Sequence, residues 1–120
     1  MAEYRITLPW PPSVNGYWRH SRGMHFISAK GKQYRKDIIQ LIQQQQLDIN
    51  THSRLKFSII ANQPDKRRRD LDNLQKAVFD SLVHAGFMAD DEQIDDFRVR
   101  RGTQVKGGSL EVLITELEEA

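Results

Sequence analysis

Two aspartates stand two positions apart, directly after a run of cations. Asp70 and Asp72 follow Arg67-Arg68-Arg69, and the apolar residues after them repeat at helical spacing. Carboxylates that converge at the entry of a helix can hold one divalent cation, and Mg²⁺ prefers a few carboxylates together with waters and substrate oxygens. Such an ion neutralises charge on a phosphodiester and activates a water for in-line attack. The pattern therefore favours phosphodiester hydrolysis.

A lysine and a second acidic stretch extend this candidate site. Lys76 follows Asp72 by four positions, which places both on one face if a helix contains them. The ammonium could then hold the attacking water or offset charge on the phosphate. The stretch Asp90-Asp91-Glu92 offers a candidate third ligand for the metal.

Positive charge is concentrated, although the 120-residue chain has a net charge of only +2. Clustered cations create local fields that attract nucleic-acid phosphates. The predicted DNA contacts are Arg67, Arg68, Arg69, Arg19, Arg22 and Lys30. A further basic group follows the second acidic stretch and consists of Arg98, Arg100, Arg101 and Lys106.

The acidic residues also have ordinary structural explanations. Asp72 could cap the helix or form a salt bridge with Lys76, and the cationic run could be a solvated loop. The stretch from Asp90 to Glu92 could be a solvated turn or another helix start. Asp80 lies two helical turns beyond Asp72 on the same stripe, and we interpret it as a salt-bridge partner.

An aromatic pair lies among the first group of cations. Tyr17 and Trp18 precede Arg19, so they could stack on exposed bases, or they could pack in the core while the cations face water. His20 and His25 are five positions apart in this segment. We interpret these histidines as surface or DNA-contacting residues, with a zinc site as the alternative.

Composition excludes several classes of protein. The chain has no cysteine, which excludes disulfides and thiolate metal sites. No apolar run approaches the length of a membrane span, and the first residues lack the pattern of a signal peptide. We therefore expect a cytoplasmic protein with no membrane partner.

The periodicity predicts an α+β fold in a single domain over residues 1–120. Strands are expected at 4–8, 25–27, 55–62, 97–101 and 110–117, with helices at 29–45 and 70–85. Ser28 is the expected N-cap of the first helix, and Gly86 ends the second. The last two strands are expected to form a hairpin. Together these elements predict a small mixed or antiparallel sheet packed on two helices.

The motifs and their order resemble those of RusA-type Holliday junction resolvases. The matching segments are Leu8-Pro9-Trp10-Pro11-Pro12-Ser13 with Asn15, Ser28-Ala29-Lys30-Gly31 with Tyr34-Arg35, Arg67 to Lys76, Ala85-Gly86-Phe87, Asp90-Asp91 and Lys106-Gly107-Gly108. They span nearly the whole chain. The stretch Arg69-Asp70-Leu71-Asp72-Asn73-Leu74 is specific, whereas the glycine turn is not.

This resemblance implies a homodimeric, Mg²⁺-dependent endonuclease, with Mn²⁺ as the alternative ion. Such enzymes, often carried by phages and prophages, resolve four-way DNA junctions by paired nicks during recombination and repair. The family's essential aspartates match Asp70, Asp72 and Asp91, and its functional lysine matches Lys76. The alternatives are a junction-binding protein that does not cut and a less selective nuclease for branched DNA.

The spacing of the aspartates along the chain bears on how they meet. A helix over residues 70–85 would be roughly 22 Å long, and residues 86–91 reach at most about 20 Å when extended. Asp91 could then hardly return to Asp70 of its own chain. We therefore predict that Asp91 meets Asp70 and Asp72 of a second subunit, whereas a shorter helix would favour a site within one chain.

Overall fold

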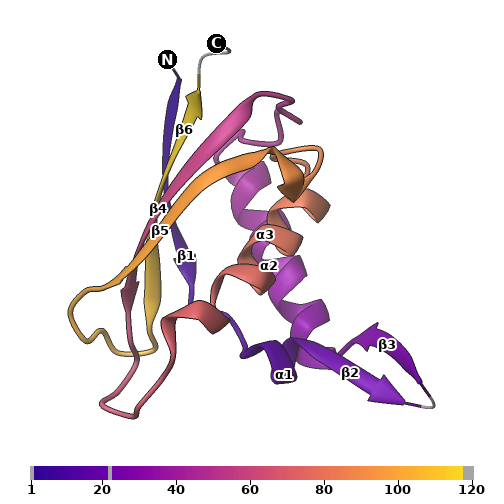
Figure 1. The fold of residues 1–120 in the computed structure, drawn as a ribbon, viewed down its shortest axis with the longest axis vertical. Coiled ribbons are helices and arrows are strands. Elements are labelled where there is room, and N and C mark those ends of the chain that lie inside the picture. The colour runs from indigo at the N-terminus through magenta and orange to yellow at the C-terminus, as the bar shows by residue number, and fades with distance from the viewer. Residues whose placement is uncertain (1, 22, 118–120) are drawn as a thin grey trace. The chain divides into compact units, whose positions relative to one another are not determined.

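Four strands form a mixed sheet in the order β1-β6-β4-β5 (Figure 1). Their bounds are β1 Glu3–Pro9, β4 Arg54–Asn62, β5 Ile94–Arg101 and β6 Ser109–Leu117. β6 runs antiparallel to both β1 and β4, whereas β5 runs parallel to β4. The computed structural model describes residues 2–21 and 23–117. The predicted sheet is thus confirmed as a mixed one.

The last two strands do not form the predicted hairpin. β5 lies next to β4, while β6 lies between β1 and β4. The hairpin prediction is therefore wrong. Residues 102–108 must pass the end of β4, a distance of about 10 Å at the usual strand spacing, and a loop of this length can do so. Alternation of apolar residues indicates that a strand forms, but it does not indicate which strand it pairs with.

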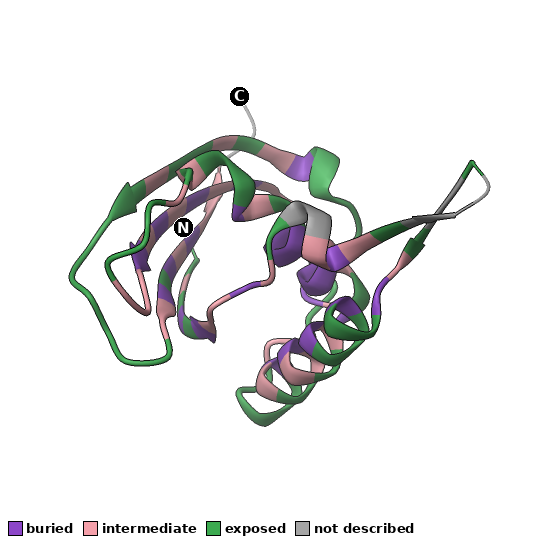
Figure 2. Ribbon diagram, turned by 90° about the horizontal axis from the view of Figure 1, so that it is seen from below, coloured by how far each residue is buried: buried purple, intermediate pink, exposed green. Residues whose placement is uncertain are grey.

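One face of this sheet supplies buried side chains. Along β4, Leu55, Phe57, Ile59 and Ala61 are buried and their neighbours are mostly more exposed, as Figure 2 shows by colour. Such alternation follows from the two-residue period of a strand, which points successive side chains to opposite faces. The same period holds in β6, where the buried residues are Leu110, Val112 and Ile114.

Contacts divide the chain into two compact units, and the sheet belongs to the first. The first unit consists of residues 1–10, 51–72 and 90–120, and the second of residues 11–50 and 73–89. The second unit contains α1 Val14–Tyr17, β2 Trp18–Ser21, β3 Met24–Ile27, α2 Ala29–Gln44 and α3 Gln75–His84. β2 and β3 form a separate antiparallel pair. Of these two strands, the sequence predicted only β3.

The start of α2 and the end of α3 lie where local sequence signals predict. The Ser28 side chain accepts a hydrogen bond from the Gly31 backbone nitrogen at 3.0 Å, which caps α2. Gly86 has a φ of +80° after α3. The Phe87 nitrogen donates to the Leu82 carbonyl at 3.1 Å, completing the Schellman arrangement that a glycine permits.

The start of the second helix differs from the prediction. A short 3₁₀ helix, η1, covers Leu71–Asn73, and α3 begins only at Gln75. The residue at the N-cap is Leu74, and no side chain caps the helix there. The suggestion that Asp72 caps this helix is therefore wrong. α3 has ten residues and is roughly 15 Å long, so helix length alone no longer separates Asp91 from Asp70.

The α+β class is confirmed by a mixed sheet and two long helices. The packing of the sheet on the helices and the single domain over residues 1–120 stay predictions. Within residues 2–21 and 23–117, no helix is both long and apolar enough to cross a membrane.

Candidate active site

In the chain, Asp70 and Asp72 follow β4 and precede α3, in the middle segment of the first unit, residues 51–72. Asp70 is in a stretch without regular secondary structure just before η1, and Asp72 lies inside η1. Both are exposed, so each carboxylate can reach solvent and a bound phosphate. Carboxylate oxygens that remain open to water suit Mg²⁺, which keeps several water ligands in proteins. The donor chemistry of the pair therefore fits the predicted ion.

Asp91 lies at the beginning of a second 3₁₀ helix, η2, which covers Asp91–Gln93. A capping box fixes this turn, because the Asp90 side chain accepts from the Glu92 nitrogen and the Gln93 side chain accepts from the Asp90 nitrogen at 2.8 Å. The Gln93 side chain also donates to the carbonyls of Thr51 and Ser53 at 2.9 and 2.8 Å. Asp91 is thereby held at the start of β4 and β5.

Asp91 and Asp70 lie at opposite ends of β5. Asp91 is three positions before β5 begins at Ile94, whereas Arg101 at the other end donates to the Arg69 carbonyl at 2.8 Å. The eight residues of β5 span roughly 23 Å. Across the described residues, no three acidic or imidazole side chains gather into a group that could hold a metal ion.

The cationic loop between β4 and η1 is organised by Asp65. Its carboxylate accepts from the Arg69 guanidinium at 2.6 Å and from the Arg67 guanidinium at 3.0 Å. These hydrogen bonds hold the pKa of the Asp65 carboxyl well below its ordinary value. Arg69 also lies over the Trp10 ring, 5.8 Å from its centroid. Ion pairs therefore shape the loop, while Lys66, Arg67 and Arg68 are exposed to solvent, so the alternative of a solvated loop stays untested.

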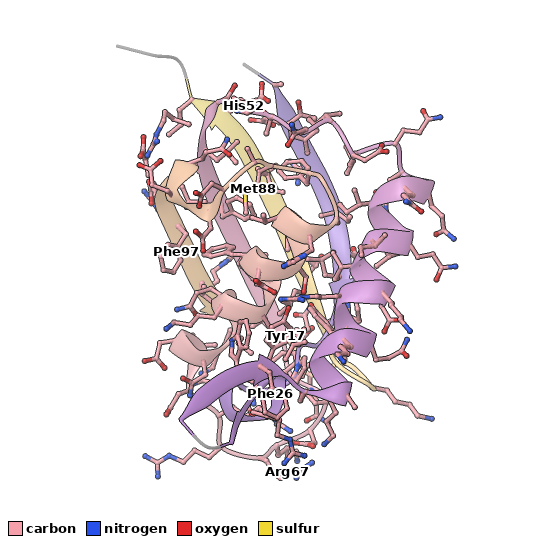
Figure 3. All side chains as sticks on the ribbon, turned by 90° about the vertical axis from the view of Figure 1, so that its right-hand side faces the viewer. Tyr17, Phe26, His52, Arg67, Met88 and Phe97 are labelled. Atoms are coloured by element: carbon pink, nitrogen blue, oxygen red, sulfur yellow. The ribbon has the colours of Figure 1, made fainter. Side chains whose placement is uncertain are left out.

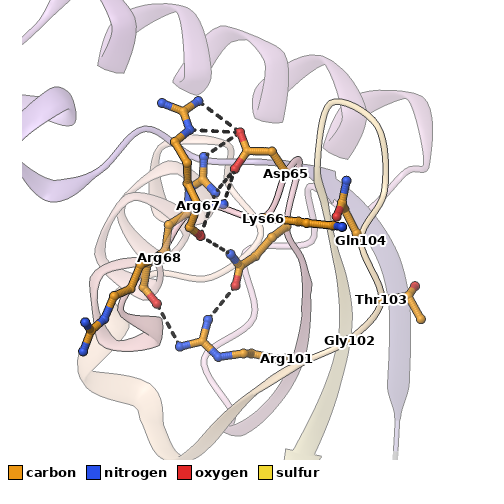
Figure 4. Close-up of a pocket in the computed structure, with 10 residues that line it drawn as sticks. Asp65, Lys66, Arg67, Arg68, Arg101, Gly102, Thr103 and Gln104 are labelled. Atoms are coloured by element: carbon orange, nitrogen blue, oxygen red, sulfur yellow. Dashed lines mark hydrogen bonds and ion pairs between the residues drawn. The ribbon is translucent and has the colours of Figure 1, made fainter.

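Arg101 ties this loop to the end of β5. Its guanidinium donates to the Gln63 side chain and to the Arg69 carbonyl (Figure 4). A pocket of about 460 Å³ opens between the loop and the residues after β5, and it is lined by Gln63, Asp65, Lys66, Arg67, Arg68, Arg69, Arg101, Gly102, Thr103 and Gln104. The sequence analysis did not predict that Asp65 would pair with the loop arginines. Its spacing of two and four residues from Arg67 and Arg69 could have indicated these ion pairs.

The second unit contains a partly buried polar cluster formed by Tyr17, Arg35 and Asp80. Tyr17 is 0% exposed, and its hydroxyl donates to Asp80. Arg35 pairs with Asp80 at 2.8 Å and lies over the rings of Tyr17 and Trp18. Burial and the hydrogen bond to Asp80 raise the pKa of the Tyr17 hydroxyl. Core packing is thus confirmed for Tyr17, whose label marks its place in Figure 3, and Asp80 is confirmed as a salt-bridge partner.

The other predicted functional residues of the second unit lie on exposed positions where they are described. Lys76 is the second residue of α3, Lys30 is in the first turn of α2, and Arg19 is in β2. Arg22 lies outside the described residues. The side chains of His20 and His25 are not described either, so the zinc alternative stays untested.

Comparison with known proteins identifies the family. Residues 9–115 match the family described as Endodeoxyribonuclease RusA. The chain belongs to the RusA family. A crossover junction endodeoxyribonuclease RusA of Enterobacteria phage HK97 is 58% identical over 118 residues, which cover 98% of each chain. A protein of the same name from Escherichia coli strain K12 is 51% identical over 117 residues, again with 98% of each chain covered.

The resemblance to RusA predicted from the motifs is therefore confirmed. The RusA match includes Asp70, Asp72, Lys76 and Asp91. It concerns the chain as a whole, so the roles of these four residues stay predictions. A third RusA relative, from Enterobacteria phage 82, is 52% identical over 117 residues.

Proposed function

We propose that this chain is a metal-dependent endonuclease that resolves four-way (Holliday) DNA junctions by paired nicks, in DNA recombination and repair. One observation carries the proposal. The relative from phage HK97, whose name is crossover junction endodeoxyribonuclease, matches 98% of this chain at 58% identity. A match of that extent leaves no separate domain in the relative to which its activity could belong.

Asp70 and Asp72 are the proposed ligands of Mg²⁺, with Mn²⁺ as the alternative ion, and Asp91 is the proposed third ligand. A bound Mg²⁺ would supply charge neutralisation at the phosphate and an activated water. The exposure of Asp70 and Asp72 supports this assignment, because substrate oxygens must reach the same ion. The carboxylates would hold the ion, while the neighbouring arginines would bind and orient the DNA backbone.

The arginines of the loop are proposed to bind phosphate. Replacing Arg67, Arg68 and Arg69 with alanine should weaken binding to every junction alike. It should also flatten the dependence of log K on log salt by about 0.7–0.9 per lost phosphate contact. Arg5→Ala is the matched control, because Arg5 is an exposed cation on β1. Titration of a labelled junction at several salt concentrations measures the slope, and an unchanged slope in the triple variant contradicts a phosphate-binding loop.

Lys76 is proposed to act in turnover. Lys76→Ala should lower the rate of cleavage by on the order of a hundredfold, the lower part of the range for one positioned acid, base or charge. Junction affinity should change little, because the loss of a single phosphate contact changes the slope of log K against log salt by only about 0.7–0.9. Single-turnover cleavage and binding measured on the same junction separate the two effects. If the variant instead binds the junction more weakly but cleaves it at an unchanged rate, Lys76 acts in DNA binding and not in turnover.

A panel of DNA substrates tests the proposal against its alternatives. Four-way junction, flap, duplex and single strand are each incubated with the protein, with and without Mg²⁺. Paired nicks confined to the junction and dependent on Mg²⁺ are the expected result. Binding to the junction without cleavage in Mg²⁺ or Mn²⁺ would instead favour the junction-binding protein. Comparable cutting of flaps would favour the less selective nuclease.

A further inference from the structure

Arg101, the last residue of β5, contacts the cationic loop between β4 and η1 at two points. One guanidinium nitrogen donates to the Gln63 side chain, and another donates to the Arg69 carbonyl at 2.8 Å (Figure 4). Gln63 in turn donates through its side-chain nitrogen to the Arg67 carbonyl at 3.0 Å. Arg101 and Gln63 therefore hold two backbone carbonyls of the loop, and the second of these directly precedes Asp70.

The Arg69 carbonyl belongs to the peptide group that leads into Asp70. A peptide group is planar, so the carbonyl of one residue lies in one plane with the nitrogen and Cα of the next. A guanidinium that fixes the direction of the Arg69 carbonyl therefore also fixes the direction in which the Asp70 nitrogen and Cα lie. Between this anchor and the Asp70 carboxylate, only rotations about the bonds of Asp70 itself are then left.

The side chain of Arg69 is anchored as well. It donates to the Asp65 carboxylate at 2.6 Å and lies over the Trp10 ring, 5.8 Å from the centroid. Arg69 is therefore held through both its backbone and its side chain, whereas its neighbour Arg68 is exposed. Asp70 thus follows the residue of the loop that is fixed at two separate points.

Close packing at the end of β5 determines where Arg101 begins. A Cβ at position 102 would lie 2.1 Å from Asn62 Oδ1, which is closer than such atoms approach in proteins. Asn62 has little freedom to move aside, because it is buried and its side-chain amide donates to Ser109 and Glu111 of β6. Glycine at position 102 therefore permits the close approach to β4 from which Arg101 reaches the loop.

The contact between Arg101 and the loop requires the geometry of arginine and not only its charge. By charge alone, the basic group of Arg98, Arg100, Arg101 and Lys106 would attract phosphate. Two guanidinium nitrogens of Arg101, however, already donate to acceptors of the loop. A guanidinium presents its donors in a planar fork that serves two acceptors at once, whereas a lysine ammonium is a single point of charge.

We propose that Arg101 is a positioning residue for the aspartate pair. It acts through the Arg69 carbonyl and sets the direction from which Asp70, and then Asp72, approaches the metal ion. A loop that is ordered before the ion arrives loses less conformational freedom on binding it, so the ion binds more tightly. The roles of Asp70 and Asp72 as metal ligands rest on the proposed function, whereas the anchoring of the loop by Arg101 does not.

Hydrogen exchange of the free chain, followed by mass spectrometry, tests the anchoring itself. Arg101→Lys keeps the charge but loses the planar fork. Amides of residues 66–72 should then exchange on the order of tenfold faster, while those of β4 and β6 keep their rates. The loop has a protected amide to follow, since the Arg67 nitrogen donates to the Asp65 carboxylate at 2.9 Å.

Arg5→Lys is the matched control, because it makes the same change at an exposed arginine of β1, the other terminal strand of the sheet. It should leave exchange in the loop unchanged. Gln63→Ala removes the second member of the network, so adding it to Arg101→Lys should give less than the sum of the two separate effects. Exchange in the loop that is the same in Arg101→Lys as in the unmodified chain would overturn the proposal.

Cleavage and binding of a four-way junction distinguish positioning from phosphate contact. Arg101→Lys and Arg101→Ala should both cut on the order of tenfold to a hundredfold more slowly, the range for residues that support metal ligands. Without metal, both should keep the slope of log K against log salt. If Arg101→Lys instead cuts at a near-normal rate, while Arg101→Ala flattens the slope by about 0.7–0.9, Arg101 is a phosphate contact and the proposal is overturned.

Calorimetric titration of the free chain with Mn²⁺ supplies a measurement that does not depend on cleavage. The dissociation constant of Mn²⁺ should rise on the order of tenfold in Arg101→Lys and stay unchanged in Arg5→Lys. Equal Mn²⁺ affinity of Arg101→Lys and the unmodified chain would overturn the positioning of the carboxylates. If the unmodified chain neither binds Mn²⁺ nor cuts junctions, the proposed function fails, while hydrogen exchange still decides whether Arg101 anchors the loop.

Discussion

Asp70→Asn and Asp72→Asn should each abolish cleavage of four-way junctions in Mg²⁺, while binding of the junction persists or tightens. The amide is nearly the same size as the carboxylate, so the loop should keep its shape. The change removes one charged ligand of the metal and reduces repulsion of the phosphate. A metal ion stabilises the transition state by several kcal/mol, and each 1.36 kcal/mol is tenfold in rate. The expected loss is therefore on the order of a thousandfold or more.

The measurement compares cleavage and binding of one labelled junction by each variant. Asp48→Asn is the matched control, because Asp48 is an exposed aspartate of the second unit, outside both acidic stretches. It should cut at the rate of the unmodified chain. If Asp70→Asn or Asp72→Asn cuts at a near-normal rate in Mg²⁺, the proposed site is wrong. Unfolding curves of the variants exclude a loss of the fold as the cause.

Elements with strong local signals could be predicted from the sequence. Ser28 caps α2 and Gly86 ends α3 because the hydrogen bonds that define a cap involve residues a few positions away. The alternation of Phe57 and Ile59 with polar residues identified β4 in the same way. These features depend on neighbours in the chain, so no tertiary information was needed.

Features that depend on distant residues could not be predicted. β5 alternates like the strand of a hairpin, yet its partner is β4, which is nearly forty residues earlier in the chain. Tyr17 stands among cations, but it is buried, and its hydroxyl donates a hydrogen bond to Asp80, 63 positions later. A local sequence pattern does not indicate which distant strand or side chain a residue will contact.

The candidate site was predicted in part for the same reason. The residue types around Asp70 and Asp72 indicated a metal-dependent reaction on phosphate. Carboxylates can bind a metal ion and arginines can bind phosphate whatever the fold, so these properties can be recognised from the sequence. Their geometry was predicted less well. The helix was expected to contain both aspartates, but it begins at Gln75, because the chain before it forms a 3₁₀ helix over Leu71–Asn73. The separation of Asp91 from Asp70 therefore comes from β5, a strand for which the sequence pattern predicted the wrong partner.

A mixture of inactive Asp70→Asn and Asp91→Asn proteins should recover nicking of the junction. If each site takes Asp70 and Asp72 from one copy and Asp91 from the other, a heterodimer of these variants collects both lesions in one site. Its second site is then intact. Random pairing makes half of the dimers heterodimers with one intact site of two, so about a quarter of the sites should be active. The products should be single nicks, because no heterodimer can cut both strands.

The matched control mixes Asp70→Asn with Asp72→Asn. These two residues belong to the same half of each shared site, so every heterodimer carries one lesion in each site and the mixture should stay inactive. Differently tagged chains, purified through both tags, ensure that heterodimers are measured. A site formed within one chain predicts instead that both mixtures stay inactive. Verified heterodimers of Asp70→Asn and Asp91→Asn that fail to nick would therefore exclude the shared site.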